Sequence, residues 1–251
     1  MTADVAYEEF LAAKRPVAQV HGFEVPAEAV NPLLKPHQVD IVRWAVHGGR
    51  RAIFAAFGLG KSVMQLEVLR LVLAREGGRA LIIAPLGVRQ EFTRDAAMLG
   101  LTATFVRRTA EVEAAGDGLF VTNYESVRDG RLDVGLFTAV SLDEASVLRS
   151  FGSKTYQTFL ALFRVVPYRF VATATPSPNR FKELIHYAGF LGVMDTGQAL
   201  TRFFQRDSTQ ANNLTLYPHK VAEFWLWLNT WAVFLQKPSD LGYEDTGYDL
   251  P

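Results

Sequence analysis

The stretch that decides the fold is Ala55-Ala56-Phe57-Gly58-Leu59-Gly60-Lys61-Ser62. The residues before it, 51–54, form a short apolar run with a β-branched residue, which is typical of a buried strand. After it, apolar residues recur at helical spacing, at Val63, Leu66, Leu69, Val72 and Leu73. A strand, a glycine-bearing turn and a helix that opens on Lys-Ser are the context that a phosphate-binding loop requires.

Each residue type in this loop has a physical role toward a polyphosphate. Gly58 and Gly60 allow the backbone to curl so that its N–H groups face the phosphates, and the helix N-terminus adds positive potential. Lys61 can reach the β- and γ-phosphates, and the Ser62 hydroxyl can hold Mg²⁺. The general motif has glycine where this chain has Ala55, so a glycine-rich turn before an ordinary helix is the alternative interpretation. The expected nucleotide contacts in the loop are Phe57, Gly58, Leu59, Gly60, Lys61 and Ser62.

The bulk composition describes an ordinary globular protein. The chain has 251 residues, of which 49% are hydrophobic and 21% charged, and its formal net charge is +0. A neutral chain has no global basic field, so any contact with nucleic acid depends on a local patch. The sequence has no cysteine, which excludes disulfides and cysteine metal sites, and its histidines show no metal-ligand spacing. Without an apolar leader or a run of about 18 apolar residues, we expect a soluble, cytoplasmic protein with no membrane contact.

Short apolar runs alternate with helical patterns over the first two thirds of the chain. This alternation predicts βαβ units and a mostly parallel sheet with helices on both faces, an α/β protein of three layers. In the helix expected at 88–99, we expect Arg89, Glu91, Arg94 and Asp95 to point outward. The expected strands are 51–54, 79–85, 101–106, 118–123, 136–142 and 168–173.

The sheet pattern stops after residue 179. We expect helices at 181–191, 198–204 and 218–235, and we interpret the aromatic residues of the last one as core rather than as a stacking platform. The expected organisation is a lead-in at 1–30, with a short helix at 5–14, an ATP-binding lobe at 31–192 and a C-terminal helical extension at 193–251.

Polar clusters follow three of the expected strands. They are the phosphate loop, Asp143-Glu144 and Thr173-Ala174-Thr175-Pro176. In open parallel sheets, ligands bind at the carboxyl ends of the strands, so we expect one site. There Asp143 would hold Mg²⁺ opposite Ser62, and Glu144 would orient or deprotonate the water that attacks the γ-phosphate. An Asp-Glu pair alone is more often a solvated loop, and its pairing with the phosphate loop favours the catalytic interpretation.

Six segments occur in an order that resembles one known family. They are Pro36-His37-Gln38, Ala55-x-x-Gly58-x-Gly60-Lys61-Ser62, Ala84-Pro85, Val121-Thr122-Asn123-Tyr124, Asp143-Glu144-Ala145-Ser146 and Thr173-Ala174-Thr175-Pro176. Residues 33–205 resemble the first RecA-like lobe of superfamily-two helicases, and most of all the Swi/Snf-type double-stranded DNA translocases. The loop form with alanine first is usual in that group, so Ala55 fits. Ser146 departs from the DEAD-box and DEAH patterns.

The resemblance implies a P-loop NTPase that uses ATP and Mg²⁺ and contacts duplex DNA through its phosphate backbone. It implies that Gln38 reads the adenine, with Phe23 as a stacking partner, and that Glu144 is the catalytic base. For Gln38 the alternative is a helix-surface glutamine, and for Arg89 it is a solvated arginine. By position, Thr173 and Thr175 would couple nucleotide state to DNA contact, and Pro85, Arg89, Thr122 and Asn123 would lie along the DNA backbone.

The family's catalytic unit has two RecA-like lobes, and no pattern of a second lobe follows residue 205. Because loss of an arginine finger lowers phosphoryl-transfer rates by about 10³ to 10⁵, we expect this chain alone to bind ATP-Mg²⁺ weakly and hydrolyse it poorly. Two alternatives remain open: a nucleotide-gated scaffold for DNA or protein without useful hydrolysis, and a small P-loop kinase or unrelated NTPase. Gln38 and residues 173–176 argue against the last. Translocation versus strand separation, and DNA versus RNA, stay undecided.

Overall fold

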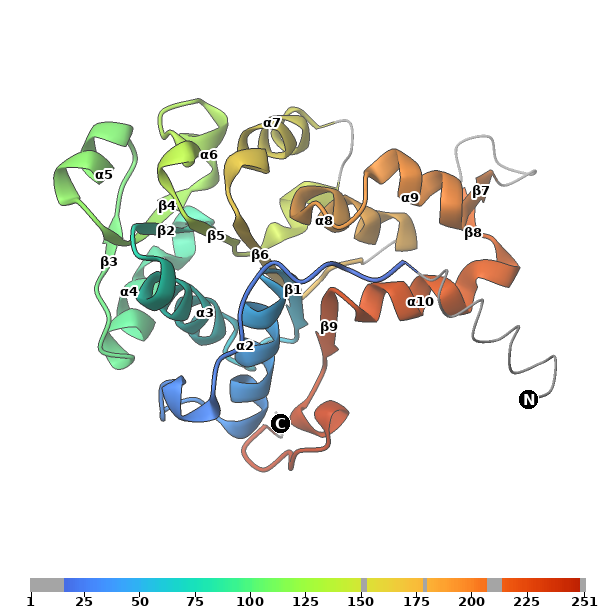
Figure 1. Ribbon diagram of the computed structural model, residues 1–251, viewed down its shortest axis with the longest axis horizontal. Coiled ribbons are helices and arrows are strands. Elements are labelled where there is room, and N and C mark those ends of the chain that lie inside the picture. The colour runs from blue at the N-terminus through green and yellow to red at the C-terminus, as the bar shows by residue number, and fades with distance from the viewer. Residues whose placement is uncertain (1–15, 150–152, 178–179, 207–213, 249–251) are drawn as a thin grey trace.

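The protein is built on a seven-stranded parallel sheet with the order β3-β4-β2-β5-β6-β1-β9 (Figure 1). The computed structural model describes residues 16–149, 153–177, 180–206 and 214–248, so the helix expected at 5–14 lies outside the described residues. Every pairing within the sheet is parallel. The strands are β1 (Arg50–Ala55), β2 (Arg79–Ala84), β3 (Ala103–Phe105), β4 (Gly118–Asn123), β5 (Ala139–Leu142), β6 (Tyr168–Thr173) and β9 (Ala232–Leu235).

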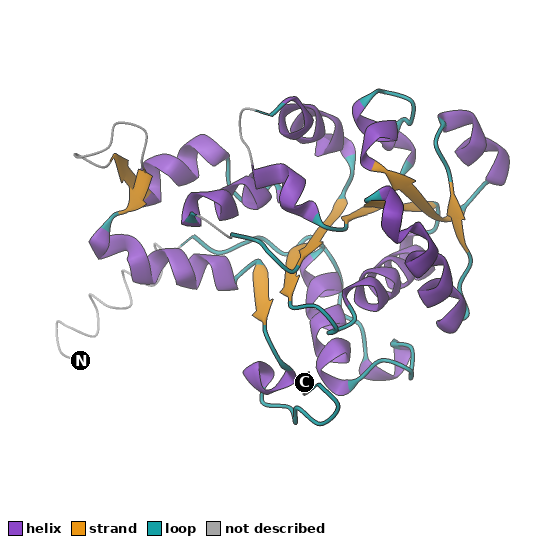
Figure 2. Cartoon of the chain, turned by 180° about the vertical axis from the view of Figure 1, so that it is seen from behind, coloured by secondary structure: helices purple, strands orange, loops and turns teal. Residues whose placement is uncertain are grey.

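Helices cover both faces of the sheet, which confirms the three-layer α/β prediction. Successive side chains of a strand point to opposite faces, so Ala52 and Phe54 of β1 lie in one core while Ile53 and Ala55 lie in the other. Helices α2, α3 and α4 pack on the second core, and α6, α7 and α8 on the first (Figures 1 and 2). The helices are α2 (Pro36–Gly48), α3 (Lys61–Glu76), α4 (Arg89–Met98), α5 (Thr109–Ala115), α6 (Tyr124–Arg128), α7 (Lys154–Leu162), α8 (Leu184–Leu191), α9 (Thr196–Phe203) and α10 (Val221–Asn229).

The segment 218–235, predicted as one helix, is a helix followed by a strand. α10 ends at Asn229, and β9 then pairs in parallel with β1, from Ala52↔Ala232 to Ala55↔Leu235. β6 pairs with one side of β1, and without β9 the backbone groups on the other side would have no strand partner. The apolar residues of β9 form that partner strand. Consequently the expected boundary at residue 192 does not separate the sheet from the rest. The core assignment of the aromatic residues is confirmed for Phe224, Trp227 and Trp231, which are buried.

Between β6 and β9 the chain first forms α8, which packs on the sheet, and then a part that projects away from it. This part contains α9, α10 and a hairpin of β7 (Phe204–Arg206) and β8 (Leu214–Leu216), and Figures 1 and 2 show it extending to one side. We name it the projecting unit, the described residues 196–206 and 214–229. Sequence patterns did not reveal this hairpin or the short helices α5, α6 and α7. Within the described ranges no helix is long and apolar enough to cross a bilayer.

Candidate nucleotide-binding site

The phosphate loop connects the carboxyl end of β1 to the first residue of α3. Gly58 and Gly60 have left-handed backbone angles, with φ of 82° and 75°. A Cβ atom on Gly60 would lie 2.5 Å from Nε2 of Gln38, whereas one on Gly58 would meet nothing within 4 Å. Gly60 is therefore required both by its backbone angle and by the side chain packed against it.

The side chain of Gln38 in α2 links this helix to the phosphate loop by a hydrogen bond. Its Nε2 donates a hydrogen bond to the carbonyl oxygen of Leu59 at 3.1 Å, and its Oε1 accepts one from the N–H of Lys35 at 2.9 Å. The residue is 7% exposed, so it is not a helix-surface glutamine. Recognition of adenine by Gln38 stays a prediction, and it would require the amide to exchange at least one of these partners.

Lys61 is folded back onto its own loop. Its Nζ donates to the carbonyl oxygen of Ala56 at 3.2 Å and lies 4.9 Å from the centre of the Phe57 ring, which is 68% exposed. Burial lowers the pKa of Lys61, and the carboxylates of Glu144 and Asp143 raise it. The ammonium group therefore lies within electrostatic reach of the acidic pair.

Asp143 follows β5 and is held by a side chain from α3. Nε2 of Gln65 donates to Asp143 Oδ1 at 2.8 Å, and Oε1 of Gln65 accepts from Ser141 Oγ at 2.7 Å. The Tyr124 hydroxyl also donates to the Asp143 carbonyl oxygen at 2.6 Å. Burial raises the pKa of the Asp143 carboxyl to about 6, against the hydrogen bond from Gln65, which lowers it. Sequence reasoning missed Gln65, although an uncharged polar residue inside an apolar helix face was a usable signal.

Glu144 has an uncommon backbone conformation and a specific partner. Its φ of 48° makes it the only non-glycine residue with positive φ in the described part of the chain. Such angles are concentrated at functional sites, where the surrounding structure holds them. Thr173 Oγ1 donates to Glu144 Oε2 at 3.1 Å, and the N–H of Thr175 donates back to Thr173 Oγ1 at 3.2 Å. The structure thus brings the acid pair and the threonine segment together.

Ser62 has a partner that the sequence did not indicate. Its Oγ donates to Asp95 Oδ2 of α4 at 2.6 Å, and Asp95 also pairs with Arg94 at 3.1 Å. The outward orientation expected for Asp95 is wrong: this residue is 8% exposed, because it points to the loop rather than to solvent.

Ser62 and Asp143 carry the oxygen atoms that a magnesium ion prefers, and their role as its ligands stays a prediction. Ser62 would first have to give up its hydrogen bond to Asp95. No group of three or more acidic or histidine side chains that could hold a metal occurs among the described residues. Mg²⁺ is usually bound through one or two protein oxygens, with water and substrate phosphates as its other ligands. An oxygen pair of this kind is therefore sufficient.

The candidate DNA-contact residues lie at the carboxyl ends of β2 and β4, which are neighbours in the sheet. Pro85 and Arg89 are exposed, and the Arg89 guanidinium lies 4.2 Å from the Phe105 ring centre. Asn123 is partly buried at the start of α6. Thr122 is 1% exposed and donates its hydroxyl to the Val106 carbonyl oxygen at 2.7 Å, so its side chain is not available to a ligand in this structure.

The stacking role expected for Phe23 is wrong. Its ring lies 6.3 Å from that of Tyr168, the first residue of β6, and 4.7 Å from the Arg75 guanidinium near the end of α3. The 16-residue helix α3 begins at the loop and runs away from it, about 24 Å at 1.5 Å per residue. Phe23 therefore lies at the amino edge of the sheet, opposite the loop.

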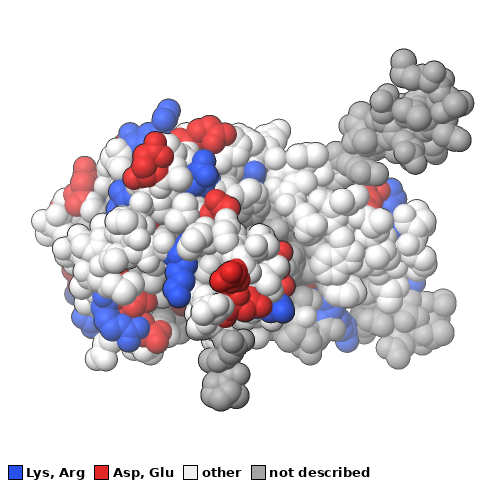
Figure 3. Space-filling model, turned by 90° about the horizontal axis from the view of Figure 1, so that it is seen from below, with Lys and Arg blue, Asp and Glu red and all other residues white. Residues whose placement is uncertain are grey.

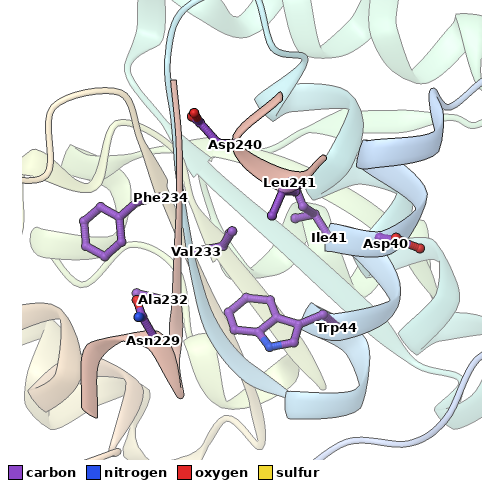
Figure 4. A pocket seen from close by; sticks show the side chains of 9 residues that line it. All are labelled: Asp40, Ile41, Trp44, Asn229, Ala232, Val233, Phe234, Asp240 and Leu241. Atoms are coloured by element: carbon purple, nitrogen blue, oxygen red, sulfur yellow. The ribbon is translucent and has the colours of Figure 1, made fainter. Parts of the chain in front are cut away.

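A pocket of about 480 Å³ lies beside the nucleotide site, between α2 and β9 (Figure 4). Val233 points toward Ile41 and Trp44, whereas Phe234 lies on the other side of the strand. No residue of the phosphate loop lines this pocket, so it is separate from the loop.

On the face shown in Figure 3, basic and acidic side chains are interspersed over the described residues. The chain as a whole has a formal net charge of +0. This face therefore offers no extended patch of one sign to a nucleic acid.

Comparisons with known proteins agree on the fold. No protein-family model matches the chain, and no curated protein matches its sequence. The SWI2/SNF2 ATPase core of Sulfolobus solfataricus, in complex with dsDNA, is similar with a TM-score of 0.61 and 19% identity, covering 72% of this chain and 41% of that one. The UvsW helicase of bacteriophage T4 is similar with a TM-score of 0.51 and 15% identity, covering 75% of this chain and 65% of that one.

At these identities the likeness establishes the fold. The chain has the RecA-like α/β fold found in helicase-type ATPase cores, as the six sequence segments suggested. It spans less than two thirds of the length of either structure.

Proposed function

We propose that this chain is the ATP-binding lobe of a DNA-dependent ATPase of the helicase or double-stranded DNA translocase type. One observation carries the proposal: Lys61, Asp143, Glu144 and Thr173 converge at the carboxyl ends of β1, β5 and β6, with the Thr173 hydroxyl bonded to Glu144. A protein that only binds phosphate needs the lysine but has no need for a threonine hydrogen-bonded to a second carboxylate. The hydrogen bond between Thr173 and Glu144 suits an enzyme in which hydrolysis of the nucleotide is coupled to a change elsewhere in the protein.

The roles follow from the positions. Lys61 would leave the Ala56 carbonyl for the β- and γ-phosphates, and Ser62 and Asp143 would hold Mg²⁺, which screens the charge of the phosphates. Glu144 would accept the proton of the attacking water, and the Thr173 hydroxyl would orient its carboxylate. Gln38 would sense the base at the end of the loop.

DNA would lie along the same edge of the sheet, past Pro85, Arg89 and Asn123. The solved SWI2/SNF2 neighbour is a complex with dsDNA, which supports duplex DNA as the partner. Contacts of this kind are made to phosphates and carry no base sequence. Because the chain spans 41% of that neighbour, we propose that a second RecA-like lobe, in the same chain or in another, completes the active site.

The test is ATP hydrolysis with and without duplex DNA, measured on this chain and on a form that includes a second lobe. We expect slow hydrolysis by this chain and DNA-stimulated hydrolysis by the larger form. Glu144→Gln should abolish turnover in the larger form while ATP binding persists, and Glu113→Gln, at an exposed glutamate, is the matched control. Unchanged biological activity of the Glu144→Gln protein would favour the nucleotide-gated scaffold instead.

A further inference from the structure

A second cluster of charged groups lies at the amino edge of the sheet, away from the phosphate loop. Arg169, the second residue of β6, is 5% exposed, although burial of a charge without a partner destabilises the folded state. Arg50 of β1 and Arg164 after α7 lie close enough to lower the pKa of Arg169, after the larger effect of burial, to about 10. Arg164 and Arg169 line one cavity, and Arg50 lies beside Arg169 next to Gly192.

These groups lack a counter-ion in the described ranges of the chain. The Arg169 guanidinium donates one hydrogen bond, from Nη1 to the Phe190 carbonyl oxygen at 2.7 Å, and its buried Nε has no partner there. None of the three arginines forms an ion pair among the described residues. Buried guanidinium groups without an anion are rare, because paired acids normally accompany them.

A cavity opens onto the same guanidinium. Its volume is about 200 Å³, and its walls include Arg164, Arg169, Thr196 and Asp195, the last being the one acid that lines it. A water molecule in the liquid occupies about 30 Å³, so the cavity has room for several. This is enough space for a tetrahedral oxyanion and part of its hydration shell. The Asp195 carboxylate is directed to the N-terminus of α9, where it accepts from the N–H groups of Gly197 and Gln198 at 2.9 Å and 3.2 Å.

Gly192 keeps the approach to the arginines clear. A Cβ atom at this position would lie 2.6 Å from Nη2 of Arg169 and 3.3 Å from Nη1 of Arg50. The residue also has a φ of 71°, in the region that favours glycine. Two guanidinium groups therefore border one glycine backbone, and Arg169 and Gly192 both line the cavity.

We propose that this cavity binds a phosphate-type oxyanion, with Arg169 as the buried contact and Arg164 at the rim. Guanidinium nitrogens bind phosphate oxygens through charge-assisted hydrogen bonds. The Thr196 hydroxyl in the wall is already hydrogen-bonded to the Tyr156 hydroxyl at 2.8 Å, so the arginines carry the proposed contact. The site lies where α7, α8 and α9 meet the sheet, so a bound anion would join the projecting unit to it. The proposal does not depend on ATP hydrolysis.

Inorganic phosphate is the probe, and Lys61→Ala is the background, because it removes binding at the phosphate loop. Phosphate, compared with chloride at equal ionic strength, should raise the unfolding midpoint in a saturable manner. Arg164→Gln should weaken the apparent phosphate affinity at least threefold, and Arg169→Gln at least tenfold. Arg108→Gln, an exposed arginine beside α5, should leave it unchanged.

A variant that is expected to strengthen phosphate binding keeps the proposal testable if the Arg169→Gln protein does not fold. Asp195→Asn removes the only carboxylate in the wall and keeps a good helix cap, so phosphate should bind severalfold more tightly. A stabilisation equal to that of chloride, or one that neither Arg164→Gln nor Asp195→Asn changes, would overturn the proposal.

A short DNA duplex identifies the source of the phosphate. If the duplex competes with inorganic phosphate in the Lys61→Ala background, the site takes a phosphate of a nucleic-acid backbone. If the duplex leaves phosphate binding unchanged, the site takes a free anion. Both results support an oxyanion site, and neither bears on whether the phosphate loop hydrolyses ATP.

Discussion

Replacement of Asp143 by asparagine should make the protein more stable while it removes the proposed metal ligand. The carboxyl is 7% exposed, and burial raises its pKa to about 6 from the ordinary 3.8. A tenfold change in an acid constant corresponds to about 1.4 kcal/mol, so holding this carboxylate ionised costs the folded state about 3 kcal/mol above pH 6. Asparagine keeps the oxygen that accepts from Gln65 and lacks the charge.

The sign of the pH dependence follows from proton binding. Between about pH 4 and pH 6 the folded protein holds the Asp143 proton more tightly than the unfolded chain does, so the contribution of this group to stability falls as pH rises. The Asp143→Asn protein has no such group. Its advantage should therefore be near zero at about pH 4, grow through this window and reach at most about 3 kcal/mol above it.

The assay is urea unfolding of both proteins across this pH range, with a chelator present, because a bound cation would lower the pKa of Asp143. Asp117→Asn is the control, since its side chain is 73% exposed and its ion pair with Arg79 is long, at 3.8 Å. An Asp143→Asn protein that is less stable at pH 8, or whose advantage does not vary with pH, would refute the reasoning.

Two further predictions concern the loop and the acid pair. Gly60→Ala should lower the free energy of unfolding by about 1 to 2 kcal/mol, because alanine is strained in a left-handed conformation. The loss should be larger still, because the new Cβ would lie 2.5 Å from Gln38 Nε2. Gly58→Ala has the same backbone cost without the clash, so equal urea midpoints for the two variants would contradict this. Thr173→Val should lower stability by about 1 kcal/mol through the lost bond to Glu144, and it should slow ATP turnover in a two-lobe form with little change in ATP affinity, as measured by nucleotide titration. An affinity loss as large as the loss of turnover would assign the threonine to binding instead.

The sequence was informative wherever local chemistry decides the structure. The six expected strands, the helix that opens on Lys61 and the curled backbone at the glycines of the loop follow from patterns of a few residues, and all are present. Asp143 and Glu144 were found because a strand delivers them directly to the carboxyl edge. Their roles stay predictions.

Contacts between distant segments were not visible in the sequence. β9 looked helical because Trp231 and Phe234 continue the aromatic spacing of α10, and only the open side of β1 makes this segment a strand. Asp95 looked solvent-facing because helical spacing says nothing about which loop lies opposite it. Phe23 was paired with adenine from its position upstream of Gln38, but the chain between them crosses to the other edge of the sheet.

The segment that carries the projecting unit joins the sheet diagonally across one strand. It leaves from the carboxyl end of β6 and returns at the amino end of β9, and these two strands flank β1 on either side. A displacement of the projecting unit is therefore passed to two strands that are both hydrogen-bonded to β1, the strand that carries the phosphate loop. β1 is in this sense the middle of a clamp whose two jaws belong to the same excursion of the chain.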